Sequence, residues 1–360
     1  MPIATIGYLN EEGKLASSYH PQISTDDLLK GYRIMVLTRH IDERMLTLQR
    51  QGVITFAMSS LGEEACSVAS AAALQISDWM YPQYREAGIL FWRGFTPLQY
   101  IHHMFGDEED LMLGRQMPNH FGARSLNVVT VSSPIGTKIP HAAGCAYAMK
   151  IQNEQSVAIC YFGEGATSEG DFHTGLNFAA VRKAPVIFFC RNNGYAISTP
   201  CSHQFACDGI ASKGVGYGIP TFRLDGNDFF AVHDVVAQAR KICLSGQGPV
   251  LLEAMTYRLG AHSSSDDPSL YRDDAEVQKW KERCPILRLR RYLENRGLWD
   301  KKKEEKLNQE IALEVTQAIE KAKGTKRPPL KYIVEHVYAQ VPQSLKKQYE
   351  ELKSLFPEEE

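Results

Sequence analysis

Apolar, β-branched runs alternate with helical stretches through the middle of this chain, from about Thr130 onward. Five such runs predict strands: NVVTVS (127–132), VAICYF (157–162), VIFFC (186–190), TFRL (221–224) and VLLEA (250–254). Between them the pattern predicts helices near Ile139–Ile151, Asp171–Arg182 and Phe229–Leu244. This alternation is typical of an α/β fold, a parallel sheet with helices on both faces. Ligands bind such sheets at the carboxyl ends of the strands.

The flanking regions have a different pattern. Ser24 precedes Asp27 by three residues, which predicts a helix start, and the helix is expected to run to about Gln51. A second helix is predicted in GEEACSVASAAAL (62–74), whereas WMYPQYREAGILFWRGFTP (79–97) is expected to be irregular. After about Asp274 the chain is helical and heavily charged. We therefore predict an arm and helix (1–50), an α/β domain (51–273) and a C-terminal helical region (274–360) packed on the same domain.

Composition narrows the class of protein. The formal charge is −2, and Lys and Arg form no stripe, so nothing indicates nucleic acid or an anionic membrane as a partner. No apolar run approaches the ~20 residues of a transmembrane helix. The opening MPIATIGYLNEEGK lacks the features of a signal or transit peptide. We expect a bacterial-type cytoplasmic protein, or a mitochondrial matrix protein if the chain is a mature form. The eight cysteines contain no Cys-x-x-Cys pair, so reduced thiols are expected.

Two predicted strands end in residues that carry candidate chemistry. Glu164 lies between Gly163 and Gly165 after the first, and Arg191 and Asn193 follow the second. If the two strands are neighbours, the carboxylate and the amide oxygen emerge side by side, as magnesium prefers. The glycines allow a ligand to approach the backbone, and the arginine suits phosphate.

Each of these sequence motifs has a simpler interpretation when taken alone. Gly-Glu-Gly is more often a turn than a site, and Asn-Asn-Gly is a common turn signal. Together, at the ends of two strands that are predicted to be neighbours, the two motifs favour a site. No Gly-Lys-Ser/Thr occurs, so a Walker-type phosphate loop is absent from the sequence.

Longer segments carry a resemblance to one family. They are RQGVITFAMSSLGEEA, YREAG, GRQMPNHFG, SSPIGTKIP, CYFGEGATSEGD, FFCRNNGYAISTP, DGND and EAMTYRLGAHSSSDDPSLYR. From about Gly31 to the C-terminal helix, the chain resembles the α subunit of the decarboxylating component of the branched-chain 2-oxo acid dehydrogenase complex. The resemblance implies the diphosphate-binding half of a thiamine diphosphate fold, with helical extensions at both ends.

The resemblance also implies a role for each matching residue. Magnesium would be bound by Glu164, Asn193 and the backbone carbonyl of Tyr195. The cofactor would be held by Tyr84, Arg85, Ser133, Ile135, Gly165, Ala166, Arg191 and His262. His262 and Ser133 would be catalytic, and Phe56 and Tyr84 would shape an apolar pocket. The simpler alternatives are a surface ion pair for Arg85, a loop cap for His262, a turn residue for Ser133 and core packing for both aromatics.

The implied reaction is the oxidative decarboxylation of a branched-chain 2-oxo acid. The acyl group would pass to the lipoyl group of a transacylase core. The glutamate that contacts the cofactor's aminopyrimidine ring belongs to a β subunit in this family. We therefore expect an α2β2 assembly with active sites between unlike chains, and no decarboxylation by the α chain alone.

Three positions depart from the family pattern. Lys138 occupies a place where the family usually has a glutamine near a bound potassium ion, beside the matching Ser132, Pro134 and Thr137. We hypothesise that its ammonium group replaces the ion at this monovalent-cation site; the alternative is a lysine turned to solvent. Ser263 matches a position phosphorylated in mitochondrial members, but a second such site is replaced by Asp273. Ala261 replaces a histidine, and nothing in the sequence explains this change.

Three alternatives stay open at this point. A pyruvate or acetoin dehydrogenase α subunit keeps the chemistry and changes the substrate. A magnesium-nucleotide phosphotransferase would use the same Glu, Asn and Arg, although it would lack the Walker lysine. A non-catalytic scaffold subunit would leave the site residues without a role.

Overall fold

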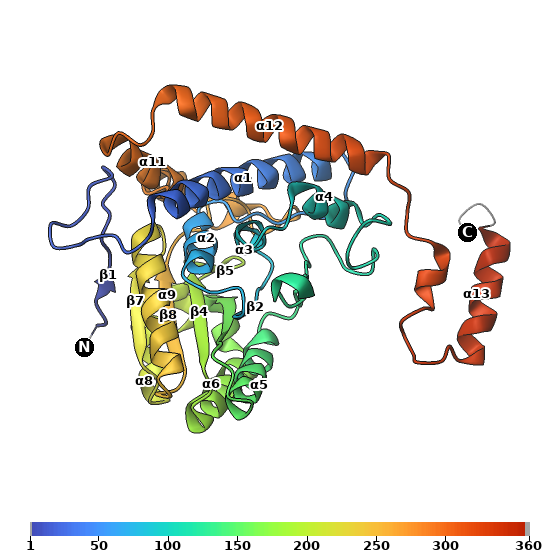
Figure 1. Cartoon of the computed structure of the whole chain (residues 1–360), viewed down its shortest axis with the longest axis horizontal. Coiled ribbons are helices and arrows are strands. Elements are labelled where there is room, and N and C mark those ends of the chain that lie inside the picture. The colour runs from blue at the N-terminus through green and yellow to red at the C-terminus, as the bar shows by residue number, and fades with distance from the viewer. Residues whose placement is uncertain (1, 357–360) are drawn as a thin grey trace.

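The computed structural model describes residues 2–356 and is organised around one six-stranded parallel sheet (Figure 1). The strand order is β1-β7-β8-β4-β3-β2. The strands are β1 (Thr5–Ile6), β2 (Trp79–Tyr81), β3 (Ala158–Gly163), β4 (Val186–Asn192), β7 (Thr221–Asp225) and β8 (Val250–Met255). A small antiparallel hairpin, β5 (Tyr195–Ala196) with β6 (Thr199–Pro200), follows β4. The α/β class predicted from the sequence is confirmed.

Helices cover both faces of the sheet because its central strands are apolar on both sides. In β3, Ile159 and Tyr161 belong to the core under one face, whereas Cys160 and Phe162 belong to the core under the other. The first face carries α1 (Thr25–Arg50), α2 (Glu64–Ala72), α3 (Ala87–Trp92), α4 (Pro97–Phe105) and α9 (Phe229–Leu244). The second carries α5 (Lys138–Ile151), α6 (Gly170–Arg182) and α8 (Ala211–Gly216).

The remaining helices lie mainly in the C-terminal region. They are α10 (Asp274–Glu282), α11 (Pro285–Asn295), α12 (Lys301–Lys323) and α13 (Gln343–Leu355). Short helical segments are η1 (Arg124–Leu126), η2 (Glu164–Ser168), α7 (Cys201–Gln204), η3 (Pro268–Leu270) and η4 (Leu330–Ile333). Figure 1 shows α12 lying across α1 and α4, while η4 and α13 stand apart from the main body. Within the described residues, no helix has the length and apolar character needed to cross a membrane.

Most predicted elements agree with the structure. The cap at Ser24 is present, because its hydroxyl accepts the Asp27 N–H at 3.1 Å. The helix predicted at Phe229–Leu244 is α9 with the same bounds, and it is capped by Asp228. The division into three regions remains a prediction, although β1 of the N-terminal arm pairs with β7 and so extends the sheet.

Two local predictions are wrong. The segment 127–132 forms only isolated bridges at Val128, because its neighbour β2 already provides the edge strand. The segment 79–97, predicted to be irregular, contains β2 and α3 and leads into α4. The aromatic residues of this segment, among them Phe91 and Phe95, gave no clear helical or strand periodicity. They are buried by tertiary packing, which the local pattern does not reveal.

The register of the sheet brings the candidate site together. In the β3–β4 pair, Gly163 lies opposite Arg191, so both strands end at the same level. Glu164 then begins η2, and Asn193 begins the turn that leads to β5. The neighbouring strands assumed in the sequence argument are therefore real neighbours.

Candidate active site

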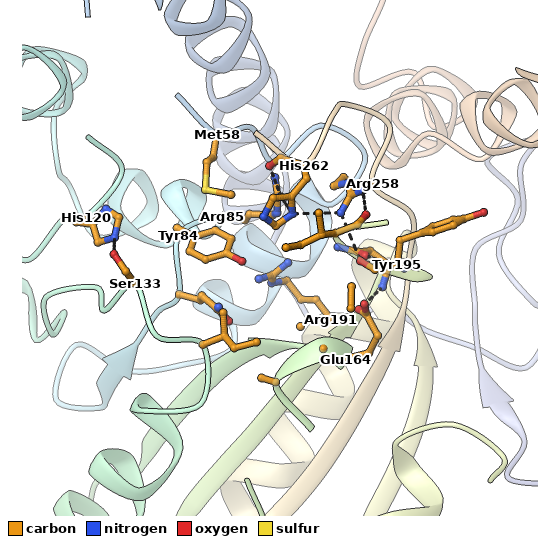
Figure 2. A pocket seen from close by; sticks show the side chains of 18 of the residues that line it. Met58, Tyr84, Arg85, His120, Ser133, Glu164, Arg191, Tyr195, Arg258 and His262 are labelled. Carbon is orange, nitrogen blue, oxygen red and sulfur yellow. Dashed lines mark hydrogen bonds between the residues drawn. The ribbon is translucent and has the colours of Figure 1, made fainter. Parts of the chain in front are cut away.

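A cavity of about 410 Å³ opens at the carboxyl ends of β3 and β4 (Figure 2). Every predicted cofactor-binding and catalytic residue lines it, and so does Phe56: Tyr84, Arg85, Ser133, Ile135, Glu164, Gly165, Ala166, Arg191, Asn193, Tyr195 and His262. Gly163, where a ligand was expected to approach the backbone, lines it as well. Seven further residues line it that were not predicted: Met58, Gln83, Met117, His120, Ala196, Ile197 and Arg258. The cavity thus unites residues from segments that lie far apart in the sequence.

The polar end of the cavity holds a buried carboxylate beside an amide. The side chain of Glu164 accepts the backbone N–H of Asn193 at 3.3 Å. Burial raises the pKa of Glu164, because the charged form loses water. Among residues 2–356 no lysine or arginine nitrogen forms an ion pair with this carboxylate. A buried carboxylate of this kind is suited to a cation that comes from outside the chain.

The turn after β4 shapes this end of the site. Gly194 has φ +91°, a conformation that side chains rarely adopt, so the turn depends on glycine there. The carbonyl of Tyr195 accepts Nη1 of Arg258 at 3.4 Å and has a second lone pair for another partner. At Gly165 an added Cβ would lie 3.0 Å from Cβ of Ala196, which explains the glycine within this close contact.

Ile197, next in the hairpin, carries backbone strain. Its φ is +57°, and the left-handed region costs a β-branched residue about 1–2 kcal/mol. Nη2 of the buried Arg258 donates to the carbonyl of Ile197 at 2.7 Å and helps hold this conformation. The side chain remains 54% exposed at the cavity, so the strain places an apolar group beside the polar end.

Two buried carboxylates flank Arg191. Its Nη1 contacts Glu63, and its Nε contacts Glu86. Burial disfavours the guanidinium charge, but Glu86 and Glu63 outweigh it and raise the pKa of Arg191. The arginine is therefore a fixed positive charge at the cavity floor (Figure 2).

His262 is held neutral by its surroundings. Its Nδ1 lies 3.3 Å from Nη2 of Arg85 and 3.4 Å from Nη1 of Arg258. Because arginine only donates hydrogen bonds, Nδ1 must accept and Nε2 must carry the proton. Burial, then Arg85 and Arg258, lower the pKa of His262 to about 4. At neutral pH the ring thus has a donor N–H and no charge.

Arg85 and Asp266 fix the backbone on either side of this ring. Nη2 of Arg85 donates to the His262 carbonyl at 2.6 Å, and its Nη1 contacts the Ser59 carbonyl. Asp266 accepts the His262 N–H at 2.7 Å and the Tyr271 hydroxyl at 2.6 Å. Arg85 is buried inside the site, so the alternative of a surface ion pair is wrong.

Ser133 has a partner that sequence reasoning did not identify. Its Oγ lies 2.6 Å from Nε2 of His120, whose Nδ1 is 3.0 Å from the Pro118 carbonyl. A carbonyl only accepts, so Nδ1 carries the proton and Nε2 accepts the serine O–H. Figure 2 shows this pair on the opposite side of Tyr84 from His262.

Apolar side chains also line the cavity, and they come from Phe56, Met58, Met117 and Ile135. Tyr84 stands between the Ser133–His120 pair and His262, and it meets the His262 ring edge-on, with centroids 6.2 Å apart. A ligand with an anionic tail and an apolar head would match this division.

The predicted monovalent-cation residues lie beside the cavity and do not line it. Ser132, Pro134 and Thr137 precede α5, and Lys138 is its first residue. Lys138 is only 9% exposed, and burial lowers its pKa. The alternative of a lysine turned to solvent is therefore wrong.

The unpredicted residues lacked distinctive local motifs. Glu63 lies in the small-residue stretch that predicted α2, and Glu86 in YREAG, whose arginine drew attention instead. Arg258 lies four residues before His262, which was the only available hint. His120 stands in GRQMPNHFG, a segment quoted for its resemblance without a role for the histidine.

Comparison with known proteins accounts for this combination of fold and cavity. The family described as dehydrogenase E1 component matches residues 32–331. The chain belongs to this family. The match spans strands β2 to β8, every cavity residue and the chain through α12, but not β1, so the residues of the candidate site all lie within the shared region.

Individual relatives agree with the family. This E1 component is 46% identical over 346 residues to the mitochondrial 2-oxoisovalerate dehydrogenase subunit alpha of Bos taurus, covering 96% of this chain and 76% of that protein. It is 47% identical over 337 residues to the Caenorhabditis elegans protein of the same name, covering 93% and 78%. With the Homo sapiens protein it shares 46% over 346 residues, covering 96% and 78%.

Proposed function

We propose that this E1 component is the α subunit of a thiamine diphosphate-dependent branched-chain 2-oxo acid dehydrogenase. The observation that carries the proposal is the buried Glu164 beside Asn193, at the floor of a cavity that also holds Arg191 and His262. The names of the relatives, 2-oxoisovalerate dehydrogenase subunit alpha, support the branched-chain substrate.

The residues present fit magnesium and a diphosphate. Magnesium would compensate the buried negative charge of Glu164, and Oδ1 of Asn193 and the carbonyl of Tyr195 would be neutral oxygen ligands. Arg191 would face the diphosphate as a fixed cation, and Arg258 has a buried Nε without a hydrogen-bond partner in the described chain. Gly165 and Ala166 would offer backbone at close range.

Within this proposal, the chain's own residues bind and orient the cofactor, and one of them holds a proton that can be donated in the site. Thiamine diphosphate, when bound, supplies the electron sink for decarboxylation. Arg191 and Arg85 would fix the anionic end, while Tyr84 and Ile135 would shape the apolar end. His262 would donate a hydrogen bond from its neutral Nε2–H to negative charge that develops in the reaction. Because this donor is already in place, no group has to reorganise during the reaction. Ser133, with its O–H held by His120, would offer oxygen lone pairs to the ligand.

The α chain supplies only part of the proposed machinery. We propose a β subunit as partner in an α2β2 assembly, with acyl transfer to a lipoyl-bearing transacylase. Exposed apolar side chains support this, because Met117 and Ile197 stand at the cavity and are 52% and 54% exposed. The relatives are mitochondrial proteins, so the mitochondrial matrix is the alternative to the cytoplasmic location expected above.

The decisive experiment is co-expression with candidate β subunits, followed by decarboxylation assays with thiamine diphosphate and magnesium. We expect turnover of 3-methyl-2-oxobutanoate by the assembly and none by the α chain alone. A preference for pyruvate or acetoin would change the substrate and keep the chemistry. Turnover by the purified α chain would contradict the shared active site. Thermal stabilisation by ATP, but not by thiamine diphosphate, would favour a nucleotide phosphotransferase instead.

We also propose that the ammonium group of Lys138 takes the place of a bound monovalent ion. Its buried position at the start of α5, beside Thr137, supports this. Turnover of the assembly should then be unchanged, within about twofold, when sodium or a bulky organic cation replaces potassium. An activity that requires added potassium would contradict the substitution.

A further inference from the structure

Glu63 contacts two of the residues assigned above to the metal and the diphosphate. One carboxylate oxygen, Oε1, accepts Nδ2 of Asn193 at 3.0 Å. The other, Oε2, contacts Nη1 of Arg191. Glu63 is 1% exposed and lies just before α2, about 130 residues away from both partners in the sequence. It does not line the cavity, and these two residues are its side-chain partners among the cavity residues that the structure describes.

These contacts determine which way the Asn193 amide faces. An ionised carboxylate only accepts, so the group that faces Glu63 must be the NH₂. On the other side, the backbone N–H of Tyr195 only donates, and it points to Oδ1 of Asn193 at 3.3 Å. Two independent neighbours thus require the same orientation, with Oδ1 on the side of Tyr195, where its second lone pair is available to a cation.

We propose that Glu63 is a positioning residue for the metal site. By binding the NH₂ of Asn193 and the guanidinium of Arg191 together, it directs an amide oxygen, and not an amide nitrogen, towards magnesium. This inference rests on the proposed magnesium–diphosphate site and adds a residue to its supporting shell. Such outer partners orient metal ligands and typically affect metal affinity by about 10–100-fold.

The chain contains a matched control for this role. Glu86 is equally buried and contacts the same arginine, through Nε, but its other oxygen accepts the backbone N–H of Gln83 at 2.8 Å. Removing the charge of either glutamate therefore disturbs Arg191 in a comparable way. Of the two, only Glu63 contacts Asn193, and its charge also acts on Glu164. A larger loss of metal affinity in Glu63→Gln than in Glu86→Gln therefore supports a role of Glu63 at the metal site, and the second test isolates the orientation of the amide.

The first test compares Glu63→Gln with Glu86→Gln in the α2β2 assembly. Glutamine has a single side-chain oxygen, and the cation of Arg191 competes for it most strongly. In Glu63→Gln the new NH₂ then faces Asn193, whose amide turns and presents nitrogen to the metal. Manganese binding in the presence of thiamine diphosphate, followed by electron paramagnetic resonance, should weaken about 10–100-fold in Glu63→Gln and less than about threefold in Glu86→Gln.

The second test uses Asn193→Asp, because a carboxylate presents oxygen in either orientation. In the native background its second oxygen would meet the Glu63 carboxylate, and like charges at that distance repel, so manganese affinity should fall. In the Glu63→Gln background the new NH₂ would donate to that oxygen, and affinity should recover to within about tenfold of native. The same substitution is therefore harmful in one background and restorative in the other.

The outcomes separate the inference from the function on which it rests. If the native assembly binds manganese with thiamine diphosphate but Glu63→Gln and Glu86→Gln bind it equally well, the positioning role is wrong and the proposed function stands. Equal effects of Asn193→Asp in both backgrounds would also overturn the role. If Glu63→Gln alone folds poorly, the double variant is compared with Asn193→Asp alone, and equal manganese affinities of these two would overturn the role. A native assembly that binds no manganese with the cofactor would overturn both proposals.

Discussion

Substitution of Glu164 by alanine is expected to abolish decarboxylation by the α2β2 assembly, with at least a 100-fold loss in kcat/KM. The carboxylate is the only acidic side chain among the three proposed magnesium ligands, and no other Asp or Glu among the described residues lines the cavity. The substitution should also raise the concentration of thiamine diphosphate and magnesium needed for half-maximal activity. Steady-state assays at increasing cofactor concentrations measure both effects.

The matched control for this substitution is Glu169→Ala. Glu169 also follows β3 but is exposed and lies outside the cavity, so its removal should leave kcat/KM within about twofold of native. Native activity in Glu164→Ala would mean that the residues of the cavity do not hold a metal cofactor. It would favour the alternative of a non-catalytic scaffold subunit.

The second large effect is expected from His262→Asn, which should lower kcat about 100–1,000-fold while the assembly stays intact. Asparagine removes the imidazole Nε2–H but keeps a polar side chain on a backbone that Arg85 and Asp266 hold in place. The substitution should slow the chemical step, so cofactor affinity should change much less than kcat. Single-turnover decarboxylation and cofactor titration separate these two quantities.

The pH dependence of His262 follows from its pKa of about 4, lowered first by burial and then by the two arginines. The native ring stays neutral between pH 5 and 8, so the unfolded chain binds a proton below about pH 6.5 that the native chain does not. The contribution of this residue to stability is therefore complete above pH 6.5 and decreases as the pH falls towards 4. Acid unfolding of His262→Asn should lack this contribution.

His141→Asn provides the comparison for both measurements, because His141 lies exposed on α5, away from the cavity. It should retain native kcat and a native acid-unfolding curve. If kcat/KM of the native assembly instead changed with an apparent pKa near 6.5 that disappeared in His262→Asn, the neutral donor assigned to His262 would be wrong.

Much of the fold was readable from local sequence because it depends on local physics. The helix at Phe229–Leu244 begins after its Asp228 cap and has an apolar face, and both features can be read from residues 228–244 alone. Strands β3 and β4 consist mainly of buried apolar residues, as expected of central strands in a parallel sheet. Their end residues, Glu164 and Asn193, could be paired from sequence because parallel neighbours present their carboxyl ends at one edge.

The sequence by itself therefore determined the type of fold, the edge of the sheet where the candidate site lies and most of the residues that line its cavity. Only the tertiary structure decided how those residues are held. Glu63 reaches Asn193 across 130 positions, and the bond between Arg85 and the His262 carbonyl spans 177. Contacts of this range depend on how distant segments pack, and no local pattern encodes them. For the same reason the charge state of His262, set by burial, by the distant Arg85 and by the nearby Arg258, emerged only from the fold.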